Sequence, residues 1–329
     1  MMFWRLLTLR RTLMAAAAAA GLAISSTSLL AQPWPTRPVK LVVNFPAGGP
    51  LDILARQAAS QLTTRLGQPF AVENIAGAAG EIGASAVSRA QPDGYTILFS
   101  IDAPFTIARA MRPLGGPRTE DLQWVALIGT SGLTVAVHPS VGIKSLAELV
   151  AMGRSRELNF STAGPGSPGH LAAMILADAA AVKATAVHYR GNAPAVMALV
   201  SGEVHAGILS SPGVLPHIKS GKLIGLAIAA NARSELLPDL PTVGEAGFAA
   251  LAQESLYVVA LPAKTPAPIV GALAEAIRAV VADTDTRQRL SVIDLTVNFQ
   301  DGSFAEKSLQ QTLERYARVV KATGMQADR

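Results

Sequence analysis

Short runs of apolar and β-branched residues alternate with longer alanine-rich segments along most of the chain. A buried strand is predicted at Val39–Phe45, and a helical pattern at Leu51–Leu66 follows it and ends at Gly67. A similar strand and helix are predicted at Glu157–Thr162 and Gly169–Ala181. Strands that alternate with helices over short loops form mainly parallel sheets with helices on both faces. The pattern therefore predicts an α/β fold with two such blocks and a cleft between them.

The same criteria predict further elements. The strands are expected at Pro69–Asn74, Tyr95–Ser100, Trp124–Gly129, Leu133–His138, Thr185–Tyr189, Val204–Ser210, Leu223–Ala229 and Ser255–Leu261. The helices are expected at Glu81–Ala90, Ser145–Gly153, Ala193–Val200, Pro266–Asp283 and Ser303–Ala322. The part of the chain after residue 265 is thus expected to be helical.

The first 31 residues have a different character. Their three arginines, which include the adjacent pair Arg10 and Arg11, precede the uncharged stretch Thr12–Ala31, and a Pro-rich segment follows. This order predicts a secretory signal peptide that is cleaved near Ala31, so that the mature protein lies outside the cytoplasm. A membrane anchor is the alternative, although alanine is a weak membrane former. The adjacent arginines also loosely match a twin-arginine signal.

Composition narrows the possible functions. The chain has 329 residues, of which 50% are hydrophobic and 16% charged, and this length suits two domains of about 150 residues. Without the first 31 residues, 25 basic residues stand against 23 acidic ones, which argues against nucleic-acid binding. The absence of cysteine excludes disulfides, thiolate metal sites and a cysteine nucleophile. The five histidines show no metal-binding spacing, and we expect no metal and no cofactor.

Three loops of small residues, each between a predicted strand and a helix, are the best candidates for binding. They are Asn44–Asp52 (NFPAGGPLD), Asn74–Gly83 (NIAGAAGEIG) and Ser161–His170 (STAGPGSPGH). Glycine lets the backbone approach a ligand, and the first N–H groups of a helix have no partner within it. A helix N-terminus is therefore an anion site, and ligands of open α/β sheets bind at the carboxyl ends of strands. These loops predict a small organic anion that main-chain amides hold without Lys or Arg.

Other motifs are weaker. Gly164–Gly169 matches GxGxxG, but the next strand ends in His188-Tyr189-Arg190 and not in the acid that a dinucleotide site requires. No Gly-x-Ser-x-Gly elbow is present, so we expect no enzyme activity. Asp52 and His170 lie in first helical turns, where each has an alternative interpretation as a structural capping or packing residue.

A series of motifs, in order along nearly the whole mature chain, resembles the substrate-binding proteins of tripartite tricarboxylate transporters, the Bug family. The segments that carry the resemblance are Phe45–Gly49, Val72–Asn74, Pro92–Thr96, Ala163–Ser167, Tyr189–Pro194, Leu215–Leu223 and Leu237–Thr242. It implies a periplasmic binding protein of type II-like fold, in which two α/β domains close on a small carboxylate. The first domain would comprise residues 32–131 plus 255–329, and the second residues 132–254.

The resemblance also implies site residues. It places at the ligand Pro46, Ala47, Gly48, Gly49, Thr162, Ala163, Gly164, Ser167 and Asn192, with Thr130 at the crossing between domains. From the loops and strand ends we add Asp52, Ala78, Ser100, His170 and Ser210. The partners would be a small carboxylate and membrane transporter subunits, with the receptor itself a monomer.

Three departures from the family pattern concern the ligand. Leu209 stands where many relatives have an acid or amide, which makes an amino-acid ligand less favourable. Asp102 would repel a ligand carboxylate, so it either points away or meets a hydroxyl or a cation. Tyr257 belongs to a pair, with Leu256, that replaces a larger aromatic pair and would widen the pocket. Two other functions remain open, namely a receptor that signals to a sensor kinase and an exported hydrolase.

Overall fold

The computed structural model describes residues 34–112, 115–230, 232–292 and 294–323. The predicted signal peptide, its cleavage point and the twin-arginine pair lie outside these residues. Within them, no helix has both the length and the apolar character needed to cross a bilayer.

The first α/β block is formed by three parallel strands and two helices. Its strand order is β2-β1-β3, with β1 paired to both neighbours. The elements are β1 (Val39–Val43), α2 (Pro50–Leu66), β2 (Phe70–Asn74), α3 (Glu81–Ser88) and β3 (Thr96–Ile101). Helix α2 ends where Gly67 takes a left-handed conformation (φ 70°), as the sequence predicts.

The second α/β block repeats this arrangement. Its parallel strands have the order β7-β5-β6. The elements are β5 (Leu158–Thr162), α6 (Pro168–Ala180), β6 (Ala184–His188), α7 (Asn192–Val200), β7 (Ala206–Ser210) and α8 (Ser211–Lys219). Helix α5 (Leu146–Ser155) precedes the block, and β8 (Ile224–Ala229) follows it.

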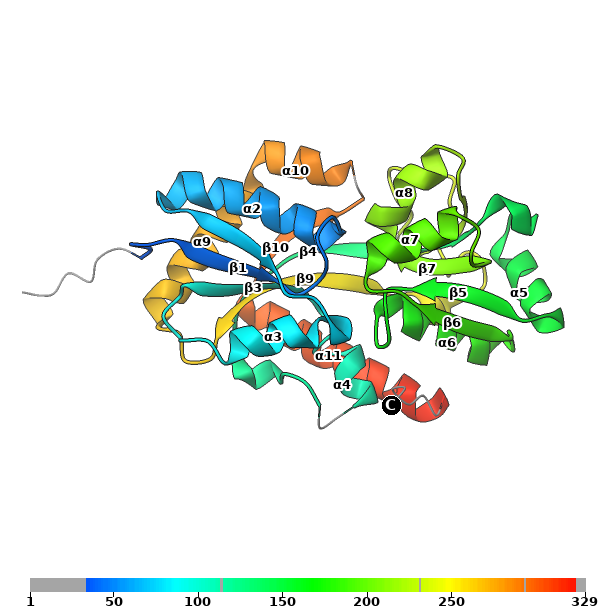
Figure 1. The fold of residues 1–329 in the computed structure, drawn as a ribbon, viewed down its shortest axis with the longest axis horizontal. Helices are drawn as coiled ribbons and strands as arrows, with labels where there is room; N and C mark the ends of the chain where they lie inside the picture. Colours follow the sequence, from blue (N-terminus) through cyan, green and yellow to red (C-terminus); the bar gives the residue numbers. More distant parts are fainter. Residues whose placement is uncertain (1–33, 113–114, 231, 293, 324–329) are drawn as a thin grey trace, which may run out of the picture. The chain divides into compact units, whose positions relative to one another are not determined.

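Two long strands join the blocks into one sheet. Strand β4 (Leu122–Val137) pairs along its first part with β9 (Glu254–Pro262), and from Leu133 onward with β7 and β8. Strand β9 also pairs with β3, and every pair that β4 and β9 make is antiparallel. Figure 1 shows both strands between the first block and the second.

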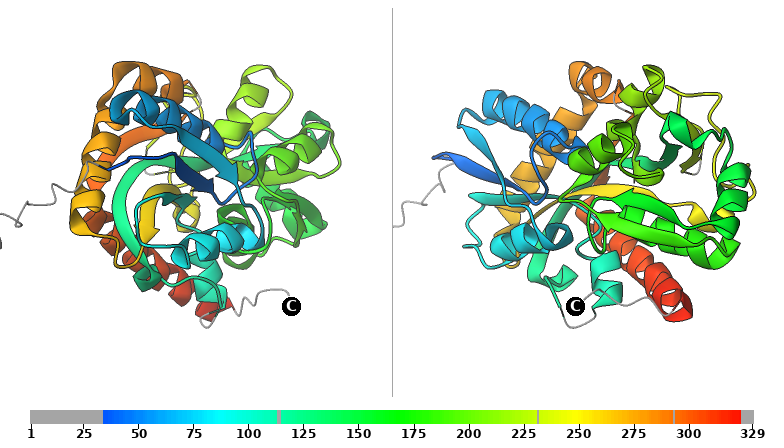
Figure 2. Two further views of the ribbon diagram at one scale, coloured as in Figure 1. Left: turned by 60° about the vertical axis from the view of Figure 1, so that its left-hand side comes forward. Right: turned by 45° about the vertical axis from the view of Figure 1, so that its right-hand side comes forward.

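The C-terminal elements return to the first block and then reach the second. They are α9 (Ala267–Ala282), α10 (Thr284–Ser291), β10 (Thr296–Asp301) and α11 (Gly302–Thr323), and a short helix α4 (Ile107–Met111) lies earlier in the chain. Along α11, Ala305 and Leu309 pack in the apolar core of the first block, whereas Tyr316 packs in that of the second. Figure 2 shows from two further directions how helices flank the sheet.

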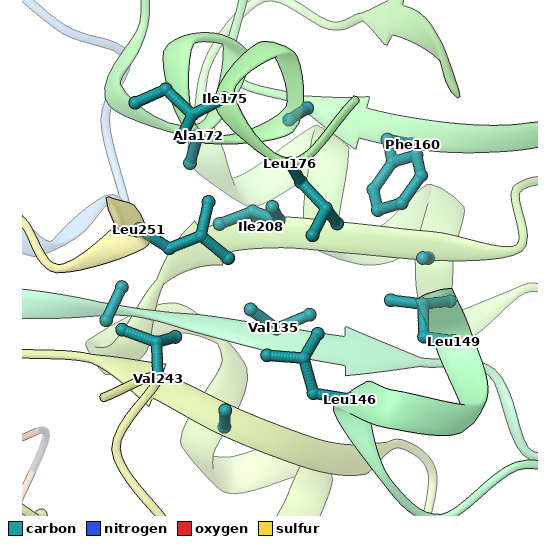
Figure 3. Close-up of a cluster of buried hydrophobic side chains, with 14 of the residues drawn as sticks. Val135, Leu146, Leu149, Phe160, Ala172, Ile175, Leu176, Ile208, Val243 and Leu251 are labelled. Atoms are coloured by element: carbon teal, nitrogen blue, oxygen red, sulfur yellow. The ribbon is translucent and has the colours of Figure 1, made fainter. Parts of the chain in front are cut away.

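Apolar side chains of strands and helices form the core of the second block. Val135 of β4, Phe160 of β5 and Ile208 of β7 are fully buried there against Leu176 of α6 and Leu146 of α5 (Figure 3). A separate cluster on the first block contains Leu98, Phe105, Trp124 and Val258. Each parallel block therefore has its own apolar core.

The α/β class and its flanking helices are confirmed, with three differences in detail. The two strands predicted at 124–129 and 133–138 are one continuous strand, β4. Strand β10 lies in a region that the sequence predicts to be helical. Parallel pairing is confined to the two blocks, because the strands that cross between them run antiparallel to their neighbours.

Candidate functional site

A narrow cavity of about 60 Å³ lies where strand ends and helix N-termini of both blocks meet. The residues that line it come from the first and third of the loops that the sequence singles out, from α7 and from four strands. They are Phe45, Pro46, Gly49, Pro50, Leu51, Ile101, Leu133, Ala163, Ser167, Pro168, Gly169, Asn192, Ala193, Ile208, Leu209, Ser210, Ser255 and Tyr257.

Four helices begin at this cavity. The residue at or just before the start of each lines it: Gly49 for α2, Ser167 for α6, Asn192 for α7 and Ser210 for α8. The first N–H groups of a helix have no partner within it, and the helix dipole places positive potential at this end. The cavity is therefore favourable for an anion, although none of its described lining residues carries a charge.

Asn192 lines this space, and its side-chain amide is held by the strand that ends beside it. Its Oδ1 accepts a hydrogen bond from the backbone N–H of Ser210 at 2.9 Å, which fixes the orientation of the amide. The Nδ2 group is then buried and has no hydrogen-bond partner in the described part of the chain. Nδ2 packs against α8, where a Cβ on Gly213 would lie 2.2 Å from it.

Hydroxyl groups from the crossing strands meet beside the cavity. The Oγ of Ser131 lies 3.1 Å from the Tyr257 hydroxyl and 3.5 Å from Ser210 Oγ. Burial raises the pKa of Tyr257, so its phenol stays neutral at physiological pH. These groups supply neutral polar atoms, not charge.

Asp52 holds the first glycine loop and does not line the cavity. Its Oδ2 accepts hydrogen bonds from the Gly48 N–H at 3.0 Å and from Arg56 Nε at 2.8 Å, and its Oδ1 accepts one from Asn74 Nδ2 at 3.0 Å. Burial alone would raise the pKa of Asp52, but the hydrogen bonds from Arg56, Gly48 and Asn74 outweigh it and lower the pKa. This carboxylate therefore positions the loop that enters α2.

Two histidines form hydrogen bonds with residues of the third loop, Ser161–His170. The Nδ1 of His170 accepts a hydrogen bond from the Gly166 N–H at 3.1 Å, and Thr162 Oγ1 lies 2.7 Å from Nδ1 of His188. The two imidazole rings pack edge to face with centroids 4.7 Å apart. Thr162 and His170 are thus buried supports of the loop, outside the cavity lining.

Asp102 meets a hydroxyl and a backbone amide. It is 1% exposed, its Oδ1 accepts from the Leu256 N–H and its Oδ2 lies 3.0 Å from Thr106 Oγ1. Burial raises its pKa to about 6 despite these hydrogen bonds. It does not line the cavity, in agreement with the expectation that it avoids a ligand acid.

The structure brings together about half of the predicted site residues. Six line the cavity, namely Pro46, Gly49, Ala163, Ser167, Asn192 and Ser210. Ala78 and Gly164 line an adjoining cavity that shares Phe45, Pro46 and Ala163 with the first and also includes Arg190. The others lie outside both linings: Ala47, Gly48, Asp52, Ser100, Thr130, Thr162 and His170.

Strand residues supply half of the lining residues that are absent from the predicted set. Ile101, Leu133, Ile208 and Ser255 belong to four strands beside the cavity. An apolar strand residue gives the same sequence signal whether it faces a core or a ligand. Among the residues that are described, no group of three or more His, Asp or Glu side chains could hold a metal ion.

Comparison with known proteins identifies the family to which the chain is similar. Residues 54–325 match the sequence profile of the family described as "Tripartite tricarboxylate transporter family receptor". Protein BugT of Bordetella pertussis is 33% identical over 303 residues, which cover 89% of this chain and 91% of BugT.

Solved structures with the same fold are also similar in sequence. MatC from Rhodopseudomonas palustris with bound malate has a TM-score of 0.83 and 30% identity, covering 87% of this chain and 100% of MatC. The periplasmic binding protein BugD has a TM-score of 0.84 and 29% identity, covering 90% of this chain and 100% of BugD.

Proposed function

Because this chain belongs to the tripartite tricarboxylate transporter receptor family, we propose that it captures a small carboxylate in the cavity and delivers it to a membrane transporter. The family and its solved neighbours are solute-binding receptors rather than enzymes. The serines of the lining, Ser167, Ser210 and Ser255, have no His, Asp or Glu beside them within the described lining, and a hydrolase would need such a base.

The observation that carries this proposal is the convergence of four helix N-termini on a cavity without charged side chains. A hydrogen bond to a charged group contributes about 1.5–3 kcal/mol, and a helix terminus adds about 0.3–2 kcal/mol. Micromolar affinity requires about 8 kcal/mol. A few N–H groups at the helix starts are sufficient to hold one carboxylate at that affinity.

Binding would occur by closure of two lobes. We place one lobe at residues 32–131 plus 255–329 and the other at 132–254, with β4 and β9 as the two crossings. The close approach of the first loop to α7 supports closure, since a Cβ on Gly191 would lie 2.8 Å from Pro46 Cγ. Strand β4 changes partners from β9 to β7 and β8 at Leu133, which is where a hinge would lie.

The protein would act in the periplasm as a monomer after export. The segment 1–31 supports this, because its arginines and alanine-rich stretch have the order of a signal peptide that is cleaved near Ala31. The similarity to BugD, a periplasmic binding protein, is consistent with that location.

A thermal-shift screen of the mature chain, residues 32–329, tests the proposal. Mono-, di- and tricarboxylates, amino acids and neutral sugars are compared, and a carboxylate at 100 times its Kd should stabilise the fold by about 2.7 kcal/mol. A shift with sugars or cations only would reject carboxylate capture.

A further inference from the structure

Two imidazole rings, which we call the histidine pair, pack together behind the third loop. His170 is the third residue of α6 and is 6% exposed, and His188 is the last residue of β6. Their ring centroids are 4.7 Å apart, with an angle of 83° between the ring planes. Neither residue lines either of the two cavities described above, so the pair acts on a ligand only through the loop that it contacts.

Both rings are linked by hydrogen bonds to the backbone of this loop. The Nδ1 of His170 accepts directly from the Gly166 N–H at 3.1 Å. His188 acts through Thr162, whose Oγ1 lies 2.7 Å from His188 Nδ1. The same Oγ1 accepts a longer hydrogen bond, of 3.4 Å, from the Gly164 N–H. The histidine pair thus fixes two backbone N–H groups of the loop.

The third loop forms a wall of both cavities and also contacts the lobe that we place at residues 32–131 plus 255–329. Gly166 makes this contact. A Cβ on Gly166 would lie 3.6 Å from the Cα of Ala108 in α4 and 3.7 Å from the Cβ of Ala79. A shift of Gly166 would therefore alter both the wall of the site and a contact between the lobes.

The hydrogen bond from Gly166 requires a neutral His170. A neutral imidazole has one N–H donor and one acceptor nitrogen, whereas an imidazolium has two N–H donors and no acceptor. Protonation of His170 would place an N–H opposite the Gly166 N–H, and no rotation of the ring restores an acceptor. The ring also lies in the first turn of α6, where the helix dipole disfavours a positive charge. A protonated His170 is therefore incompatible with the loop as it stands.

The charged groups near the histidine pair lie on flanking elements. Strands β5, β6 and β7 and the short helix η4 (Ala249–Leu251), which pack against α6, contain no Asp, Glu, Lys or Arg. The charged and other ionisable groups on α6 itself, on α11 and α4 and in the segments beside the loop are Asp178, Glu306, Lys307, Glu314, Arg315, Tyr316, Arg318, Lys321, Arg109, Arg112, Glu81, Asp102, Tyr189, Arg190 and Glu203. Each carboxylate among them is exposed or is bonded to another side chain or to the backbone.

We propose that His170, packed against His188, is a positioning residue that holds the third loop in its ligand-binding conformation only while its ring is neutral, so that acid pH weakens ligand binding. This inference rests on the proposed function, because the loop belongs to the same site. Histidine ordinarily takes up a proton near pH 6.5. Affinity should therefore be full at pH 7.5 and decrease as the pH falls to 5.

The variant His170→Asn tests this role by calorimetric titration with malate and with adipate between pH 7.5 and 5. The asparagine Oδ1 replaces Nδ1 as the acceptor for the Gly166 N–H, but it takes up no proton in this range. The two proteins should agree within about 3-fold at pH 7.5. At pH 5 the parent should bind about 10-fold more weakly than the variant, against a limit of about 30-fold for one histidine.

Comparison at equal pH cancels the protonation of the acids themselves and of Asp102, whose pKa is about 6. A ratio of the two affinities that does not change with pH would overturn the inference.

His205→Asn is the matched control. The Nδ1 of His205 also accepts from a backbone N–H, that of Asn159 at 3.0 Å, so the same kind of contact is changed. This contact lies at the opposite end of β5 from the third loop and outside both cavities. The control should lose affinity at pH 5 as the parent does. A control without that loss would contradict a specific role of His170.

A measurement without ligand separates this inference from the proposed function. In ¹H–¹⁵N spectra of the mature chain, the amide resonance of Gly166 should shift between pH 7.5 and 5 in the parent and stay in place in His170→Asn. An unchanged Gly166 resonance in the parent would reject the inference alone. Failure of malate, adipate and every other carboxylate of the thermal-shift screen to bind at pH 7.5 would instead reject the proposed function.

Discussion

Pro46 and Gly191 approach each other so closely that a Cβ on Gly191 would lie 2.8 Å from Pro46 Cγ and 3.0 Å from Pro46 Cδ. Pro46 belongs to the loop after β1, and Gly191 is the residue before α7, so the contact joins the two α/β blocks beside the cavity. Only a residue without a side chain permits this approach.

Gly191→Ala should therefore weaken ligand binding by at least about 10-fold, because its Cβ holds the two blocks apart. Gly191 also has a φ of 116°, which disfavours any side chain, so strain alone could lower affinity. The double variant Gly191→Ala, Pro46→Ala separates the two causes, since the alanine that replaces Pro46 lacks Cγ and Cδ. Calorimetry should show partial recovery in the double variant, and no recovery would contradict the steric explanation.

Asn192→Asp should remove carboxylate binding while keeping the fold. Aspartate has the same shape and can still accept the hydrogen bond from Ser210 N–H, but it adds a negative charge beside the cavity that would repel a ligand carboxylate. We expect affinity at pH 7 to fall at least about 100-fold, as measured by calorimetry, with little change in Tm. Asn298→Asp, an exposed position on β10, adds the same charge and should bind normally. Retained affinity in Asn192→Asp would exclude this side chain from the site.

Gly48→Val tests whether the backbone conformation of the first glycine loop controls ligand affinity. Gly48 has a φ of 79° and open space around its Cα, so the substitution acts through backbone strain and not through a clash. The same is true of Gly221, with a φ of 72°, which lies after α8 and outside both cavity linings. Both variants should lose about 1–2 kcal/mol in the free energy of unfolding, but only Gly48→Val should weaken the ligand, by about 10-fold. Equal affinities of the two variants would show that the loop conformation does not control binding.

Asp102→Asn should change how stability depends on pH. The folded-state pKa of Asp102 is about 6, above the ordinary value of 3.8, so the folded state holds the proton more tightly than the unfolded state. This contribution to stability is fully present below pH 3.8 and is lost as pH rises through 6. The asparagine variant has no such loss, so its free energy of unfolding relative to the parent should rise between pH 4 and 7 by at most about 3 kcal/mol.

Urea unfolding of both proteins at several pH values measures this difference. Comparison of the two proteins cancels the opposite effect of carboxylates with lowered pKa, such as Asp52. The asparagine can still accept from the Leu256 N–H and donate to Thr106 Oγ1, so the site remains satisfied. A constant difference across this pH range would show that Asp102 has an ordinary pKa.

Local sequence signals predict the parts of the molecule that depend on short-range order. The alternation around Val39–Phe45 and Glu157–Thr162 predicts both parallel blocks, and the glycine loops predict where helices begin at the cavity. Strand β10 was missed because its residues Thr296–Asp301 are mostly exposed or half-buried and lack an apolar run. Its place in the sheet depends on pairing with β4, which lies far away in the sequence.

In the candidate site too, short-range features are predicted from the sequence and contacts between distant segments are not. Asp52 and His170 stand in first helical turns and are predicted both as ligand contacts and as structural supports, and their hydrogen bonds correspond to the second interpretation. The orientation of the Asn192 amide becomes apparent only when the N–H of Ser210, at the end of β7, donates to its Oδ1. Contacts between distant segments have no local signature, so the sequence could not separate cavity residues from those behind it.

A crystal structure of the mature chain with its best-binding acid tests the central claim most directly. One carboxylate should lie within hydrogen-bond distance of the N–H groups at the starts of α2, α6 or α7, with no Lys or Arg side chain in contact. A carboxylate paired with Arg190, or bound outside this cavity, would contradict the account.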